Sequence, residues 1–92
     1  IAQQYTTTSE TAYVYKGGPT YNLTKERKEQ MYEYYRMIFP EYYLELTNTS
    51  KWQSASAEKK IDLLADLRKE VGTVAKVWLA QRLVETGVPS DR

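Results

Sequence analysis

The chain has 92 residues, a net charge of +1, and neither cysteine nor histidine. Its length supports one small domain, and its near-neutral charge offers little attraction to a nucleic-acid backbone. Without His or Cys, the commonest general base, the commonest metal ligand and every thiolate nucleophile are missing, so we expect no enzymatic activity, cofactor or metal. No apolar run approaches the ~20 residues that span a bilayer, and we expect no membrane partner.

Residues 1–22 form a predicted extended arm that is rich in Thr, Ser and Tyr. Residues typical of β-strands flank Gly17, Gly18 and Pro19, and this pattern predicts a turn between two short extended pieces. An isolated hairpin is only marginally stable in water, so the arm must lie on its own helices or on a neighbouring chain. Because the chain begins with Ile1 and not with Met, we expect it to be part of a longer polypeptide.

The first helix is predicted over residues 24–47. Thr24 is a favourable N-cap because its hydroxyl oxygen can accept a hydrogen bond from the first turn. Pro40 lies inside the helix, where it cannot donate to the carbonyl of Arg36 and its ring clashes with that group. We therefore expect a kink, or a break into two helices, around residues 36–40.

The second helix is predicted over residues 57–86, with Ser56 as its N-cap. A stop signal follows it in the sequence. Gly87 can take the left-handed conformation that ends many helices, Val88 can then pack back on the last turn, and Pro89 prevents any continuation.

Each helix carries one apolar face. On the second helix this face consists of Leu64, Leu67, Val71, Val74, Ala75 and Trp78. On the first helix it consists of Met31, Tyr35, Ile38, Phe39, Tyr42 and Leu46. The polar connector, residues 48–56, is long enough for the helices to return antiparallel. The predicted fold is mainly α: an antiparallel helical hairpin over residues 23–92 with an N-terminal, β-hairpin-like extended arm.

The end of the second helix lacks a partner in this arrangement. The second helix covers ~45 Å against ~35 Å for the first, and its apolar residues leave the common face after Lys76. The arm or a neighbouring chain must cover this end. Met37 and Leu44, on the side of the first helix opposite its apolar face, also lack a partner in this arrangement. The candidate protein-interface residues are Tyr13, Tyr15, Val77, Leu79, Leu83, Val84, Met37 and Leu44.

The aromatic stretch 31–46 has two interpretations. Its five tyrosines and one phenylalanine could stack on nucleic-acid bases, or they could pack as core and interface. Most of the rings share one helical face and acidic residues interleave with them, so we favour packing. The acid pairs Asp62/Asp66 and Glu41/Glu45 lie four residues apart and could chelate a cation, but their many Lys and Arg neighbours favour a solvated helix surface.

Several short motifs follow one another along most of the chain: Gly17-Gly18, Leu23-Thr24, Tyr34-Tyr35, Trp52, Ser56-Ala57-Glu58-Lys59 and Ala75-Lys76. With these motifs the chain resembles a helical module of large virion proteins of tailed bacteriophages, namely internal (ejected), tape-measure-like and large polyvalent proteins. The resemblance implies a structural or docking role in the virion or the host cytoplasm, with no catalytic residues.

Two functional hypotheses remain from the sequence. The first is a non-enzymatic assembly module of a phage virion or a similar large complex, which docks on protein neighbours as a homo-oligomer or within a larger viral assembly. The alternative is a small nucleic-acid-binding or regulatory helical protein, which would bind DNA or RNA with a steep dependence on salt.

Overall fold

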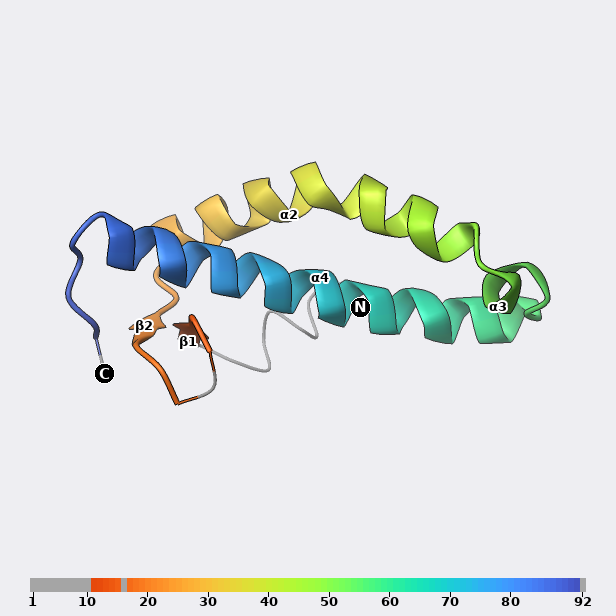
Figure 1. The fold of residues 1–92 in the computed structure, drawn as a ribbon, viewed down its shortest axis with the longest axis horizontal. Helices are drawn as coiled ribbons and strands as arrows, with labels where there is room; N and C mark the ends of the chain where they lie inside the picture. Colours follow the sequence, from red (N-terminus) through yellow and green to blue (C-terminus); the bar gives the residue numbers. More distant parts are fainter. Residues whose placement is uncertain (1–10, 16, 92) are drawn as a thin grey trace.

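Two long antiparallel helices form the body of the protein (Figure 1). The computed structural model describes residues 11–15 and 17–91. Helix α2 spans Lys25–Thr47 and helix α4 spans Ala57–Glu85, joined through the short helix α3, Ser50–Gln53. The predicted antiparallel helical hairpin is therefore confirmed. The predicted β-hairpin-like arm is present as a small N-terminal β-hairpin.

Each helix begins at a residue whose side chain accepts a hydrogen bond from the first turn. Thr24 accepts from the backbone N–H of Arg27 at 3.3 Å, and Ser56 accepts from that of Lys59 at 3.2 Å, so both predicted N-caps are confirmed. Thr49 caps α3 in the same way, which the sequence analysis missed because a one-turn helix has no apolar period to detect.

Helix α2 stays continuous through Pro40, so the predicted break does not occur. The helix bows away from α4 in its middle (Figure 1). Pro40 is exposed, and a proline on the outer side of a helix bends it without a steric conflict with the core. In place of a kink or a break the helix curves, because the turns around Pro40 keep their helical geometry.

Helix α4 ends in the way that the sequence predicts. Gly87 has a φ of 80°, its N–H bonds to the carbonyl of Val84 at 3.0 Å, and the N–H of Val88 bonds to the carbonyl of Leu83 at 2.9 Å. These two bonds define a Schellman motif. Both Val88 and Leu83 pack against the core, so the cap also turns the chain back toward the hairpin.

The hairpin consists of β1, Thr11–Tyr13, and β2, Thr20–Asn22, paired antiparallel with Ala12 opposite Tyr21. Its turn is closed by a bond from Gly18 N–H to the Tyr15 carbonyl at 2.8 Å. The Tyr15 ring lies so close to Gly18 that a Cβ there would meet it at 3.0 Å. Residues 1–10 of the predicted arm lie outside the described residues.

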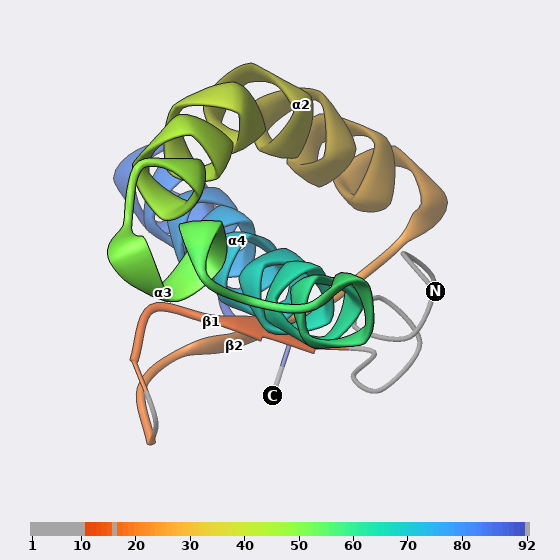
Figure 2. The ribbon, with the colours of Figure 1, turned by 90° about the vertical axis from the view of Figure 1, so that its right-hand side faces the viewer.

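The hairpin packs on α4, on the side away from α2 (Figure 2). The core that results is formed by Ala12, Tyr21, Leu23, Met31, Ala75, Leu79 and Ala80. Within the described residues, the arm therefore covers the projecting end of α4 in its own chain. The small side chains of Ala12, Ala75 and Ala80 let the strand approach the helix closely.

This packing corrects the predicted apolar face of α4. Side chains spaced four residues apart are buried, namely Leu63, Leu67, Val71, Ala75 and Leu79. Leu64, Val74 and Trp78 from the predicted face are only half-buried. The prediction assumed that α4 packs on one partner helix. In the structure α2 packs on one side of α4 and the β-hairpin on the other, and this second partner changes which residues of α4 are buried.

The Schellman motif makes a prediction about stability. Gly87→Ala should lower the free energy of unfolding by about 1 kcal/mol, because an L-residue with a Cβ disfavours positive φ. Gly87→Asn should cost less, since Asn tolerates the left-handed conformation better. Urea unfolding followed by circular dichroism measures both. No Cβ clash exists at this position, so equal losses for Ala and Asn would contradict a conformational origin.

Candidate interaction surface

A stacked aromatic pair lies where α2 and α4 meet at the surface. The rings of Tyr34 and Trp78 are parallel within 3° and their centroids are 4.2 Å apart. The guanidinium of Arg82 lies over the Trp78 ring, 5.9 Å from its centroid. Both aromatic residues are half-buried, so each contributes its faces to packing and its edge to the surface.

Shallow hollows adjoin this stack along the line between the two helices, which we call the α2–α4 groove. One hollow of about 490 Å³ is lined by Gln30, Glu33, Tyr34, Met37, Trp78 and Arg82. A second of about 280 Å³ is lined by Tyr34, Thr73, Val74, Val77, Trp78 and Gln81. The stacked pair belongs to both hollows, so they form one mixed apolar and polar surface.

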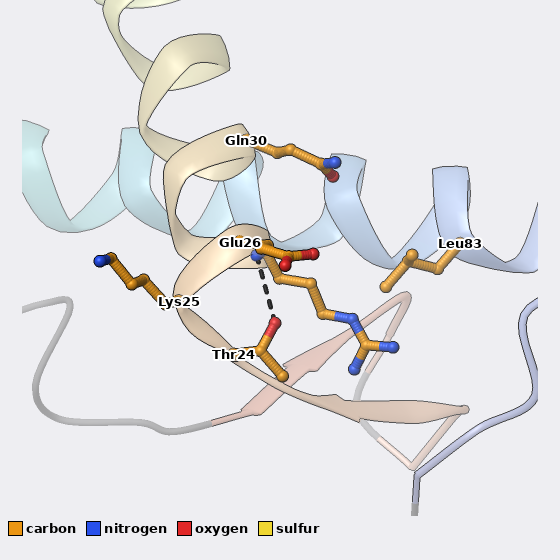
Figure 3. Close-up of a pocket in the computed structure, with 6 residues that line it drawn as sticks. Thr24, Lys25, Glu26, Gln30 and Leu83 are labelled. Carbon is orange, nitrogen blue, oxygen red and sulfur yellow. Dashed lines mark hydrogen bonds between the residues drawn. The ribbon is translucent and has the colours of Figure 1, made fainter.

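A third hollow of about 500 Å³ continues the groove at the start of α2 and is lined by Thr24, Lys25, Glu26, Arg27, Gln30 and Leu83. Gln30 comes to it from α2 and Leu83 from α4, while Thr24 is engaged in capping the helix (Figure 3). Gln30 also lines the hollow beside Trp78. The groove therefore extends from the β-hairpin end of the molecule to the middle of the helices.

Three of the candidate interface residues line the groove, each in a different hollow, namely Met37, Val77 and Leu83. Met37 is the most exposed of these, with 74% of its surface accessible. Tyr15, Leu44 and Val84 are also exposed but do not line the groove, and Tyr13 is half-buried in β1.

Leu79 requires a correction. It is 0% exposed and belongs to the core between α4 and the hairpin, so it cannot serve as an interface residue in this structure. The sequence placed it off the helix–helix face, which is right for a helix with one partner. The hairpin supplies the second partner that buries it.

A row of rings follows α2 away from the stacked pair. Tyr35 stacks on Phe39 with centroids 5.4 Å apart, Phe39 on Tyr43 at 6.2 Å, and Tyr43 meets the ring of Trp52 edge-on at 6.2 Å. The ammonium group of Lys60 lies 5.3 Å from the centroid of that last ring. These rings use their faces on one another, which leaves fewer faces for stacking on a base.

The second feature that joins distant parts of the sequence is residues 88–91, which we call the clasp. After the Schellman motif it runs along the outer edge of β2. The Asp91 N–H donates to the Thr20 carbonyl at 3.0 Å, and the Val88 carbonyl accepts a hydrogen bond from the Tyr21 hydroxyl at 2.9 Å. The sequence holds no local signal for the clasp, because the partners of these residues lie about 70 positions away.

The side chain of Asp91 is the centre of the clasp. Its carboxylate accepts a hydrogen bond from the Asn22 N–H at 3.0 Å and forms an ion pair with Arg27. The Arg27 guanidinium also donates to the Asn22 carbonyl at 3.0 Å. The hydrogen bond from Arg27, and then that from Asn22, hold the pKa of Asp91 below its ordinary value.

Residues 11–15 and 17–91 contain neither a cluster of metal-ligating side chains nor a helix suited to cross a membrane. No three His, Cys, Asp or Glu side chains gather there in a way that could hold a metal ion. Among the helices that the structure describes, none combines the length and the apolar character needed to cross a membrane.

Comparison with known proteins gave no match to a family model, to a curated protein or to a solved structure.

The placement of Leu79 and Met37 can be tested by one pair of variants. Leu79→Ala should lower the free energy of unfolding by about 2–5 kcal/mol, because it empties a fully buried site. Met37→Ala should change it by no more than about 0.5 kcal/mol, because the side chain is mostly in water. Similar losses in urea denaturation for the two variants would contradict the described packing.

The clasp should respond to acid. A carboxyl group whose pKa is lowered by folding stabilises the fold above its unfolded value of about 3.9, and this contribution is lost as the pH falls through the folded value. We expect the chemical shift of the Asn22 amide to move below about pH 4 in an NMR titration of the wild type. In Asp91→Asn this acid transition should be absent, and its persistence would assign it to another group.

Proposed function

We propose that this chain is a non-enzymatic assembly module that docks on protein neighbours through the α2–α4 groove. The observation that carries the proposal is the exposure of Met37, at 74%, beside the half-buried rings of Tyr34 and Trp78. Val77 is a further half-buried apolar residue of this surface. A partner that covers the groove would remove all four side chains from water.

The composition of the groove supports a protein partner. Protein interfaces are enriched in Tyr, Trp, Met and Arg at their centres, and Tyr34, Trp78, Met37 and Arg82 meet here. Methionine is flexible and adapts to an irregular partner surface. Gln30 and Gln81 line the groove and are exposed, so their amide groups can hydrogen-bond to a partner or to water.

The same surface gives weaker support to nucleic-acid binding. Glu33 lines the groove and would repel a phosphate, and Trp78 already uses its ring faces for Tyr34 and Arg82. The net charge of +1 adds no general attraction for a polyanion. We therefore favour the assembly role over the nucleic-acid-binding or regulatory alternative.

The likeness of the sequence to helical modules of tailed-phage virion proteins supports a setting for this role. In that setting the chain would be one segment of a large virion protein, and the groove would contact neighbouring proteins in the particle or in the host cytoplasm. A docking role also agrees with a small pair of helices that presents a groove along part of its length.

Oxidative footprinting with mass spectrometry tests the docking role, because the chain contains two methionines in very different environments. In the free chain Met37 should oxidise quickly and Met31, which is 1% exposed, should stay protected. In the natural assembly Met37 should become protected several-fold, since a docked partner excludes the oxidant. Met31 serves as the internal control, because the same helix carries it.

Two results would contradict the proposal. Equal oxidation of Met37 in the free chain and in the assembly would mean that no partner covers the groove. Binding of the free chain to single-stranded DNA or RNA at low salt, lost steeply as salt is added, would favour the nucleic-acid alternative.

A further inference from the structure

The outer edge of β2 is protected by groups that do not belong to a strand. The Thr20 N–H donates to the Ser90 hydroxyl at 3.3 Å, and the Thr20 carbonyl accepts from that hydroxyl at 2.7 Å and from the Asp91 N–H at 3.0 Å. The Asn22 N–H donates to the Asp91 carboxylate, and the Asn22 carbonyl accepts from the Arg27 guanidinium at 3.0 Å and from the Thr24 N–H at 3.1 Å. Every outward backbone group of Thr20 and Asn22 is thus satisfied.

Such an edge needs protection because unpaired backbone N–H and C=O groups of an edge strand can pair with a strand of another chain. The clasp provides it mostly with side chains. Of the bonds that the clasp itself makes to Thr20 and Asn22, only that from Asp91 N–H to the Thr20 carbonyl joins two backbones, while the others use the Ser90 hydroxyl and the Asp91 carboxylate. Ser90 and Asp91 are exposed, and exposed bonds of this kind exchange readily with water.

The edge beneath the clasp is complementary to itself. Thr20 and Asn22 both direct their backbone groups outward, with Tyr21 between them. Two copies of β2 laid antiparallel about Tyr21 place Thr20 of one copy opposite Asn22 of the other. When the Arg27 guanidinium also leaves the Asn22 carbonyl, which keeps its bond from the Thr24 N–H, each such pair can exchange two N–H···O=C bonds, and the arrangement makes four backbone bonds around a two-fold axis.

The packing of the helices leaves room for this pairing. Helix α4 packs on β1, which is the strand farther from the outer edge of β2. In a joined sheet with the strand order β1-β2-β2-β1, the two α4 helices would lie over the outer strands and would not meet over the central pair. The clasp is then the element that occupies the place of the second copy.

We propose that Ser90 and Asp91, at the outer end of the clasp, are an exchangeable guard of β2: while they are closed the edge is occupied, and when they open it pairs with β2 of a second copy of the chain. This inference does not depend on the α2–α4 groove, and it adds a second, separately controlled contact to the molecule. Opening at these two residues loses exposed hydrogen bonds, while Val88 keeps its bond to the Tyr21 hydroxyl and the core between the hairpin and α4 stays intact.

The variant Asp91→Ala tests the guard in the full chain, with Asp66→Ala as the matched control. Asp66 is an exposed carboxylate in the middle of α4, so its removal changes the net charge by the same amount. At low protein concentration, the Asn22 amide of Asp91→Ala should exchange with deuterium about tenfold faster than in the wild type, since two bonds of the clasp are lost. Asp66→Ala should exchange like the wild type.

Sedimentation velocity over a wide range of concentration tests the pairing. Asp91→Ala should show a concentration-dependent monomer–dimer equilibrium at concentrations where the wild type and Asp66→Ala stay monomeric. Adding Asn22→Pro should restore the monomer, because it removes two of the four inter-copy donors. Adding Met37→Lys should leave the dimer unchanged, because Met37 lies on the groove and not on the edge.

Each failure has a distinct meaning. An unchanged Asn22 exchange rate in Asp91→Ala would overturn the guard, and a variant that exchanges quickly but stays monomeric would overturn the pairing. A dimer that Met37→Lys abolishes and Asn22→Pro leaves intact would also overturn this inference, because association would then occur through the groove. That last result would still be compatible with the proposed docking function. Circular dichroism of Asp91→Ala/Asn22→Pro establishes that the helices remain folded.

Discussion

The burial of α4 between α2 and the β-hairpin is the contact on which the rest of the structure depends. A two-stranded hairpin with three-residue strands is not stable alone in water, and two helices without a third element bury little surface between them. Leu79 and Ala80 connect the two parts, because both are fully buried among residues of the hairpin and of α2. Ala12 and Tyr21 complete the contact from the strand side.

The local signals in the sequence predicted the local structure well. Thr24, Ser56 and Gly87 act through atoms within a few residues of themselves, so their roles as caps and stop can be read without knowledge of the fold. A distortion of the helix at Pro40 was predicted, but the helix curves there and does not break. The tolerance of a proline depends on whether the helix can bow at that point, and the packing of the whole hairpin decides this.

The signals that depend on distant contacts could not be predicted in the same way. The buried face of α4 is shifted because a second partner covers it, and the sequence period alone does not reveal how many partners a helix has. The same effect moved Leu79 from the candidate interface into the core, while Met37 and Val77 came together at the groove. The pairing of Arg27 with Asp91 joins residues 64 positions apart and has no local pattern at all.

The close packing of β1 against the last third of α4 also has a consequence for how the chain folds as it is made. The ribosome synthesises the hairpin residues 11–22 well before the helical turns at Ala75, Leu79 and Ala80 on which they lie. Until those turns emerge, Tyr21 has no core to enter, and the hairpin is in contact with solvent. The contacts between the hairpin and α4 therefore form late, and an interruption of synthesis inside α4 would release a chain that has β1 and β2 but lacks the helical surface on which they pack.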